Sequence, residues 1–455
     1  MNLQHPAASG WTRHVTRGAV RVATVALTAL ATIAASVVLA LPANAANVVT
    51  PGNFTGYGFD QCTAPTQASM DAWLNNSPYW AVGIYISGDS RACTSQPNLT
   101  PTWVSNQLAK GWRLLPITLG PQASCTTRPR YLEQVRINPS PTNGYSIARS
   151  QGRGEADKAV AVSQNLGIVT GSTLWYDIES FATENTDCRE SALSFLSAWS
   201  NQLHRLGYVS GVYSSASTGI KMLDDARVNR PGTYTMPDRI WIADWNLKAD
   251  VFSTFVRDTG WMPHQRVHQY RGGHPETYGG VTIEIDNDWV DLGLGSTIAA
   301  EGAHCGGAAS FNFPTYPTRR IGDSGARVRT IECMLRLRGF FTGTIDGVYD
   351  TGLGEAVRRY RVSRGLSSIT VTGPAAWVAM LSQGTGPLVK YGAASLAVRR
   401  LQRALNAADA AGLPITGVFA GQTNAAVKRY QSDHGIPATA VVTTAMWNLL
   451  FAGTP

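Results

Sequence analysis

Eight short apolar segments, separated by stretches with helical spacing, constrain the fold of this chain most strongly. They lie between residues 54 and 289 and read FTGYGF, WAVGIYI, RLLPITL, LWYDI, SGVYS, RIWIADW, RVHQY and VTIEIDND. Between them, segments such as 188–207 repeat apolar residues three or four positions apart, and Gly207 is a typical helix C-cap. Alternation of strands and helices favours a parallel sheet. Eight strands in about 240 residues predict a (β/α)8 barrel over residues 54–292; because the last units are poorer in helix, an incomplete barrel is the alternative.

Carboxylates stand at the ends of these segments. Asp60 closes the first, the pair Asp177 and Glu179 closes the fourth, and Asp244 closes the sixth. Three more acids follow the eighth strand at alternating positions, namely Glu284, Asp286 and Asp288. Side chains two positions apart on a strand share a face, and the C-terminal ends of barrel strands meet at the mouth where active sites lie. Crowded carboxylates repel one another, so at least one pKa at this mouth should rise.

Carboxylates grouped in this way suit glycoside hydrolysis, in which a neutral acid protonates the leaving oxygen while an ionised one assists. Aromatic faces beside them would suit sugar rings. The candidates in or next to the same segments are Tyr57, Trp175, Tyr213, Trp241, Trp245 and Tyr270. Each residue also has a structural alternative: Asp60 or Asp177 as a helix cap, Asp288 in a turn, and Trp175 in the core.

The first 45 residues have the order of a secretory signal peptide. Three arginines precede the apolar run VATVALTALATIAASVVLAL, and the small-residue site ANA at 43–45 follows it. This order predicts cleavage near Ala45 and export, with no membrane contact afterwards. An uncleaved anchor is the alternative, because the apolar run is long enough to span a bilayer.

Charge is divided unevenly between the two parts of the remaining chain. Residues 46–318 carry a net charge of −4, whereas residues 319–455 carry +9. A basic part is attracted to a polyanion, and for an exported protein an acidic cell-envelope polymer fits better than nucleic acid. Simple solubility is the alternative explanation.

All six cysteines follow the signal segment, and an even number in an exported chain predicts disulfides. Six cysteines allow 15 pairings, so the sequence leaves the pairing open. The pairing that we favour is Cys62–Cys93, Cys125–Cys188 and Cys305–Cys333. No CxxC motif or Cys/His cluster in the sequence indicates a metal site.

A segment rich in Gly, Pro and Ser at 305–320 predicts a linker, and an internal repeat follows it. Nine positions recur at an offset of 70, from Val328 and Val398 to Trp377 and Trp447. Two copies of a small helical module are therefore expected, at 321–384 and 388–451. The second copy, with LAVRRLQRALNAAD, ITGVFAGQTNAAVKRYQSDHGI and TTAMWNLL, resembles the peptidoglycan-binding module of cell-wall hydrolases. The first lacks the Leu-Gln pair of that pattern, so its binding stays open, and packing modules without a glycan site are the alternative.

The barrel segment also resembles a known family. The stretches GYGFDQC, WYDIES, WIADWN and VHQY…GGVTIEIDNDWVD resemble the glycoside-hydrolase-like domain of secreted actinobacterial proteins. That domain is similar to the lysozyme-type muramidases of glycoside hydrolase family 25. The resemblance implies a general acid at Glu179, a supporting carboxylate at Asp177, and positioning of sugar or water by Asp60 and Asp286. The resemblance also implies that Gln269 and Tyr270 contact substrate, and it offers Asp288 as the alternative match to Asp286. It implies neither a metal nor an organic cofactor.

Three functions fit these observations. The first is a secreted peptidoglycan hydrolase held at the wall by its basic repeats, with peptidoglycan or another envelope polysaccharide as partner. The second is a glycan-binding protein of the same fold that does not cleave, since fold does not determine function. The third is a structural envelope protein in which the carboxylates are caps and ion-pair partners. The oligomeric state is left open by the sequence.

Overall fold

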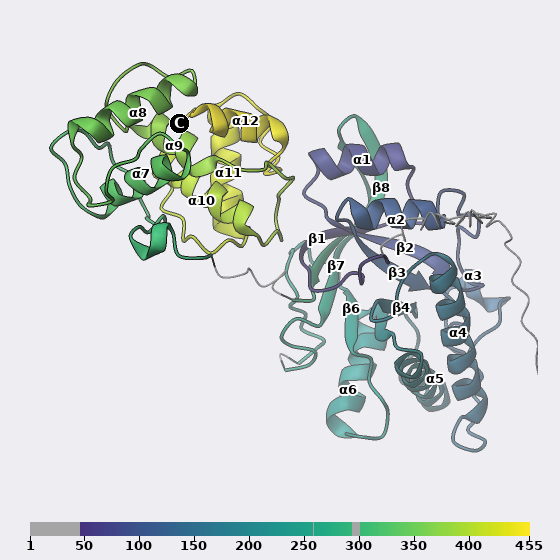
Figure 1. Ribbon diagram of the computed structural model, residues 1–455. Coiled ribbons are helices and arrows are strands. Elements are labelled where there is room, and N and C mark those ends of the chain that lie inside the picture. Colours follow the sequence, from purple (N-terminus) through teal and green to yellow (C-terminus); the bar gives the residue numbers. More distant parts are fainter. Residues whose placement is uncertain (1–45, 258, 294–300) are drawn as a thin grey trace, which may run out of the picture. The chain divides into compact units, whose positions relative to one another are not determined.

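A computed structural model describes residues 46–257, 259–293 and 301–455 (Figure 1). The predicted signal peptide, residues 1–45, lies outside the described residues. Eight strands follow one another around a closed barrel, so the (β/α)8-type fold is confirmed and the ring of strands is complete. The strands are β1 (Thr55–Asp60), β2 (Ala81–Ser87), β3 (Arg113–Thr118), β4 (Thr173–Asp177), β5 (Val209–Ser215), β6 (Arg239–Ala243), β7 (Arg266–Tyr278) and β8 (Val281–Asp291).

The last strand departs from the predicted parallel arrangement. Strands β1 to β7 are parallel, but β8 runs antiparallel to both β7 and β1. Gly279 and Gly280, both with positive φ, make the tight turn between β7 and β8. Asp286 and Asp288 therefore lie inside β8 and not at its C-terminal end, which corrects the prediction. The register of β8 pairs Asp60 with Asp286, so these acids still meet the end of β1.

Helices cover the outside of the barrel (Figure 1). They are α1 (Gln67–Asn76), α2 (Pro101–Ala109), α3 (Pro129–Leu132), α4 (Ser146–Asn165), α5 (Thr186–Arg205) and α6 (Lys221–Asn229), and a π-helical turn (Ala216–Ile220) precedes α6. Their starts follow capping rules: the Thr66 and Asn185 side chains accept from backbone N–H groups in the first turns of α1 and α5. After β6, the described residues before β7 form no helix, in line with the helix-poor end of the sequence.

Two apolar layers hold this domain together. Between strands and helices lies a core that includes Phe59, Trp73, Tyr176 and Trp199, all fully buried. Inside the barrel a smaller core surrounds Trp175, whose ring meets Trp241 edge-to-face at 5.5 Å. The alternation of these residues places Trp175 and Asp177 on the inner face of β4 and Tyr176 on the outer face.

The C-terminal region is helical and repeats itself closely. Its helices are α7 (Ala326–Leu337), α8 (Thr351–Ser363), α9 (Pro374–Ser382), α10 (Leu396–Ala408), α11 (Gly421–Asp433) and α12 (Thr444–Ala452). The contacts repeat at the same offset of 70: Trp377 Nε1 donates to the Pro317 carbonyl, and Trp447 Nε1 donates to that of Pro387. The two copies share one apolar core.

The predicted linker at 305–320 is packed against the helical region. Phe311 and Tyr316 are buried in its core, and Thr330 donates a hydrogen bond to the Ser310 carbonyl. The composition suggested flexibility, but two aromatic side chains in the segment have apolar area to bury, and this outweighs the local preference for a loop. A short 3₁₀ turn, Cys305–Gly307, begins the segment.

All three favoured disulfides are present: Cys62–Cys93, Cys125–Cys188 and Cys305–Cys333. Within the described part of the chain, no helix has the length and apolar character needed to cross a membrane.

Candidate active site

The floor of the barrel mouth is apolar and supports a buried layer of carboxyls. Trp175 and Trp241 are both 0% exposed, and Trp241 Nε1 donates a hydrogen bond of 2.9 Å to Asp288 Oδ1. Gly83 on β2 makes room for the Asp60 side chain, because a Cβ at position 83 would lie 2.4 Å from the Cβ of Asp60. Both tryptophans are therefore core residues beneath the carboxyls. Contrary to the prediction, neither is open to a sugar ring.

Asp60 and Asp288 form a buried carboxyl pair. Burial, followed by the charge of Asp286, raises the pKa of Asp60 to about 8. Burial and the charge of Asp60 raise the pKa of Asp288 well above its usual range. Both shifts favour the protonated form of these buried carboxyls.

Gln269 on β7 ties this pair to the open part of the site. Its Nε2 donates to Asp60 Oδ2 at 2.8 Å. Its Oε1 accepts from the Tyr213 hydroxyl at 3.0 Å and from Trp245 Nε1 at 2.9 Å. The amide therefore fixes two aromatic side chains relative to the buried carboxyls.

The two acids at the end of β4, Asp177 and Glu179, lie in different environments. Asp177 is buried, and burial followed by the charge of Glu179 raises its pKa well above the usual range. Its Oδ2 accepts from the Tyr85 hydroxyl at 3.4 Å. Glu179 lies just past the strand with its side chain 19% exposed. The predicted rise in pKa thus occurs at Asp60, Asp177, Asp286 and Asp288.

The loop after β3 holds Glu179 from one side. Gln122 accepts from the Glu179 backbone N–H at 2.7 Å and donates to the Asp177 carbonyl at 2.8 Å. The Tyr131 hydroxyl donates to Glu179 Oε1 at 3.4 Å. Arg128 forms an ion pair with Glu179, with Nη2 at 2.9 Å from Oε2. Residues between β3 and α4 thus contact the backbone N–H and both carboxyl oxygens of Glu179.

Two cavities meet at Glu179. The first, of about 170 Å³, is lined by Asp60, Asp286, Tyr85 and Arg130 among others. The second, of about 280 Å³, is lined by Tyr213, Asp244, Trp245 and Arg128 among others. Glu179 is the one residue common to the two linings. Burial raises the pKa of Asp286 to about 6. The first cavity therefore combines Asp60, which is protonated at neutral pH, with Asp286, which titrates near neutrality.

The predicted aromatic residues differ in their placement. Tyr213 and Trp245 line the second cavity, and Trp245 is 64% exposed. Tyr57 points away from the barrel interior and packs against Trp289 at 4.9 Å, so it lies outside both cavities. Tyr270 is close enough to Asp288 for that charge, after burial, to raise its pKa.

The remaining predicted acids lie at the rim. Asp244 lines the second cavity and accepts from the Ser253 hydroxyl at 2.8 Å. Glu284 is exposed on β8. Among the described residues, no group of three or more His, Cys, Asp or Glu side chains is arranged to hold a metal ion.

Sequence reasoning missed several residues of this site. Tyr85 is the next-to-last residue of the segment WAVGIYI and lies on the inner face with Ile117, so a polar aromatic residue near a strand end was a usable signal. Gln122, Arg128 and Tyr131 come from the irregular segment after β3, which has no periodicity from which to predict contacts with Glu179.

Comparison with known families agrees with this architecture. Residues 71–290 match the model of the Rv2525c-like, glycoside hydrolase-like domain, and residues 395–450 match the putative peptidoglycan binding domain. The chain thus contains a glycoside hydrolase-like barrel followed by a peptidoglycan-binding domain in its helical region. No curated protein matches the chain.

Solved structures with a similar fold come from several bacteria. The Tat-secreted protein Rv2525c of Mycobacterium tuberculosis is 15% identical, with a TM-score of 0.34 over 52% of this chain and 95% of that chain. A family 25 glycosyl hydrolase of Bacillus anthracis is 13% identical, with a TM-score of 0.31 over 52% of this chain and 89% of that one. The modular autolysin LytC of Streptococcus pneumoniae is 11% identical, with a TM-score of 0.33 over 51% and 46%.

Proposed function

We propose that this protein is an exported hydrolase of cell-wall glycan that cleaves glycosidic bonds of peptidoglycan by carboxylate acid–base catalysis. One observation carries the proposal: Glu179 stands where two cavities meet, beside the carboxyls of Asp60, Asp177 and Asp286. A glycan strand lying across both cavities would place a glycosidic oxygen next to Glu179.

The roles follow from the environments of the four carboxyls. Glu179 would donate the proton to the leaving oxygen, because it alone reaches both cavities. Asp177, whose raised pKa favours the protonated form, would support it from below by orienting an N-acetyl group of the substrate. With a pKa of about 6, Asp286 is ionised at pH 7 and would orient water or the sugar. Asp60, with a pKa of about 8, stays protonated and would donate a hydrogen bond.

The helical region would keep this site at its substrate. It contains the peptidoglycan-binding match at 395–450, and residues 319–455 carry a net charge of +9. A polymer bound by one module raises the effective concentration of the same polymer at the other. This division of labour accounts for the pairing of a weakly acidic barrel with a basic tail.

A second function, glycan binding without cleavage, is favoured by the ion pair between Arg128 and Glu179. A carboxyl oxygen bound to a guanidinium is not available to the leaving oxygen. Arg128 is 50% exposed, so it is free to move when substrate enters, and the two functions differ in whether it does.

One experiment separates the two functions. The mature protein is incubated with purified cell walls, and released reducing ends and pelleted protein are measured together. For a hydrolase, Glu179→Gln should reduce product release at least 100-fold and leave pelleting unchanged, whereas Glu184→Gln, an exposed acid five residues later, should change neither. Wild-type protein that pellets with walls but releases no product would establish the binding function instead.

A further inference from the structure

An exposed aromatic surface borders the second cavity at Glu179. It belongs to the segment after β6, residues 244–256, in which four large apolar side chains are open to solvent. They are Trp245, Leu247, Phe252 and Phe255, which are 64%, 70%, 58% and 38% exposed. Of these four, Trp245 and Phe255 line the cavity. Single exposed apolar side chains need no explanation, but several on one segment beside a candidate site mark a surface that binds a partner.

The indole of Trp245 is held at its edge and on one face. Its Nε1 donates to Gln269 Oε1 at 2.9 Å, and Gln269 in turn donates to Asp60. A Cβ at Gly272 on β7 would lie 2.5 Å from Cζ2 and 2.6 Å from both Cε2 and Cη2 of Trp245. A point nearly equidistant from three consecutive ring atoms lies over the face of the ring and not beside its edge. Glycine at position 272 therefore lets the indole lie flat against β7, and the opposite face is the one open to solvent.

The backbone that carries this side chain is fixed as well. The buried ring of His268 has Nδ1 2.7 Å from the Asp250 carbonyl oxygen and Nε2 2.7 Å from that of Asp244. The Leu247 N–H donates to the Tyr270 carbonyl at 2.9 Å. The aromatic surface is therefore preorganised, and a ligand that binds it does not carry the cost of ordering the segment.

The polar groups beside the aromatic faces suit a sugar. Ser215, Ser217 and Asp244 line the same cavity as Trp245 and Phe255. Hydroxyls and a carboxylate next to an aromatic face can hydrogen-bond the hydroxyls of a sugar while its C–H face lies on the ring. A lipid surface fits less well, because it would cover these polar groups without offering them partners.

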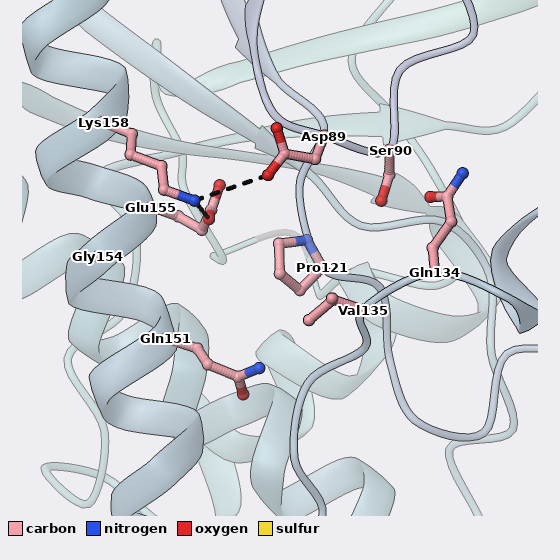
Figure 2. Close-up of a pocket in the computed structure, with 9 residues that line it drawn as sticks. All are labelled: Asp89, Ser90, Pro121, Gln134, Val135, Gln151, Gly154, Glu155 and Lys158. Atoms are coloured by element: carbon pink, nitrogen blue, oxygen red, sulfur yellow. Dashed lines mark hydrogen bonds and ion pairs between the residues drawn. The ribbon is translucent and has the colours of Figure 1, made fainter.

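The cavity beside α4, on the outside of the barrel, lacks this combination (Figure 2). Its volume is about 410 Å³, and none of its described lining residues is aromatic. The ammonium of Lys158 there lies 2.9 Å from Glu155 and 3.7 Å from Asp89. Aromatic faces next to hydroxyls and a carboxylate thus distinguish the site at Glu179 from this cavity.

We propose that Trp245 and Phe255 form a stacking platform for one sugar ring of a glycan strand, on the side of Glu179 that the second cavity occupies. The C–H face of the sugar packs on the open face of the indole, and its hydroxyls meet the polar lining of the cavity. The inference rests on the proposed function for the identity of the ligand, a glycan strand. It concerns binding alone, so its test needs no cleavage.

The test is acrylamide quenching of tryptophan fluorescence in the full mature chain carrying Glu179→Gln, which prevents cleavage of the probe. Within the described part of the chain, Trp245 is the only tryptophan that is mostly exposed, so quenching reports it directly. The probe is a soluble, peptide-free oligosaccharide of cell-wall glycan. Its addition should lower the quenching of Trp245 at least threefold, and the protection should saturate.

Two matched pairs of variants tie this protection to the stacking platform. Phe255→Ala should raise the half-saturating concentration at least tenfold, whereas Phe252→Ala, exposed on the same segment but outside the cavity lining, should change it less than twofold. Gly272→Ala places a Cβ against the indole and should also raise it at least tenfold. At Gly273 a Cβ would meet only Glu284 Oε1, at 3.7 Å, so Gly273→Ala should leave binding unchanged. Far-UV circular dichroism checks that all four variants are folded.

The outcomes keep this inference apart from the proposed function. Protection of Trp245 in a protein whose wild type releases no reducing ends from walls would support the platform and contradict cleavage. Cleavage that Glu179→Gln abolishes, without protection of Trp245, would overturn the platform and leave the hydrolase. Vesicles of phosphatidylglycerol that protect Trp245 when the oligosaccharide does not would identify a lipid surface and overturn the inference. Equal effects of Phe252→Ala and Phe255→Ala would overturn it as well.

Discussion

Arg128 Nη2 lies 2.9 Å from Glu179 Oε2, so a mobile guanidinium shields the residue that we assign as proton donor. Arg128 is half exposed, and ion pairs of this kind contribute only about 0–1 kcal/mol. The pair is therefore weak enough for a substrate to break. Whether this ion pair opens when substrate enters distinguishes cleavage from binding alone.

Removing this partner should increase hydrolysis. In Arg128→Ala, Glu179 no longer has to leave the guanidinium before it reaches the glycosidic oxygen. A saving of up to about 1 kcal/mol corresponds to a rise in kcat of up to about fivefold. The measurement is release of reducing ends at saturating wall concentration, with Arg149→Ala, an exposed arginine on α4, as control. A large loss of kcat would show instead that Arg128 assists the reaction.

The buried carboxyl pair should make stability depend on pH above neutrality. The pKa of Asp60 is about 8, above its unfolded value of about 4, so the protein binds more protons when folded. Its stabilising contribution is complete below pH 4 and is lost as pH rises through 8. Asp60→Asn keeps an acceptor for Gln269 and cannot ionise, so its Tm should fall less than that of wild type between pH 6 and 9.

Thermal unfolding at these pH values measures the difference. One proton fewer changes the slope by about 1.4 kcal/mol per pH unit, which corresponds to several degrees in Tm. Asp71→Asn, at an exposed carboxylate on α1, is the control and should follow the wild-type curve. Parallel curves for wild type and Asp60→Asn would contradict the raised pKa of Asp60.

How far the sequence predicts this structure depends on the kind of signal at each element. Each of the eight strands overlaps one predicted apolar segment, because burial on both faces leaves a clear apolar run, although β7 continues eight residues beyond RVHQY. The direction of β8 is not readable from such a run. The pair Gly279-Gly280 between two strand patterns was the missed signal, since two glycines there indicate a hairpin.

The candidate site divides in the same way. The acids on strands were found because strand alternation determines which side chains share a face. Trp175 and Trp241 were misjudged because the same alternation places residues two positions deeper in the core, and a sequence does not show depth. Arg128 acts from an irregular loop whose path is set by tertiary contacts, among them the Cys125–Cys188 disulfide.

That disulfide should matter for both stability and the site. It joins the loop that carries Gln122 and Arg128 to the start of α5, across a separation of 63 residues. Replacing both Cys125 and Cys188 by Ser should lower the free energy of unfolding by about 2–4 kcal/mol, measured by urea titration. Product release at a temperature where the variant is fully folded should also fall, because the loop no longer positions Glu179. The same double replacement at Cys305 and Cys333, in the helical region, is the comparison: it should cost similar stability and leave the Arg128 loop and product release intact.

Among the buried positions at which the two helical copies differ is Glu332, which replaces Gln402, and this difference should give the first copy a pH dependence that the second lacks. Gln402 on α10 accepts from the Gly417 N–H at 2.8 Å and donates to the Val418 carbonyl at 3.0 Å. Seventy residues earlier, Glu332 accepts the matching bond from the Gly347 N–H at 2.9 Å but lacks an amide donor. Burial, and then the neighbouring Asp346, raise the pKa of Glu332 to about 7.

Because the folded pKa of Glu332 lies above its unfolded value of about 4.3, its contribution to stability is complete below that value and is lost as pH rises through 7. Glu332→Gln supplies the missing donor and should raise the free energy of unfolding at pH 8 by on the order of 1–2 kcal/mol, with little change at pH 4. The reciprocal Gln402→Glu should lower it at pH 8, and Glu355→Gln, an exposed acid on α8, should have no effect beyond its lost ion pair with Arg358. Urea titrations at the two pH values measure all three variants, and equal stability of Glu332→Gln and wild type at pH 8 would contradict the assignment.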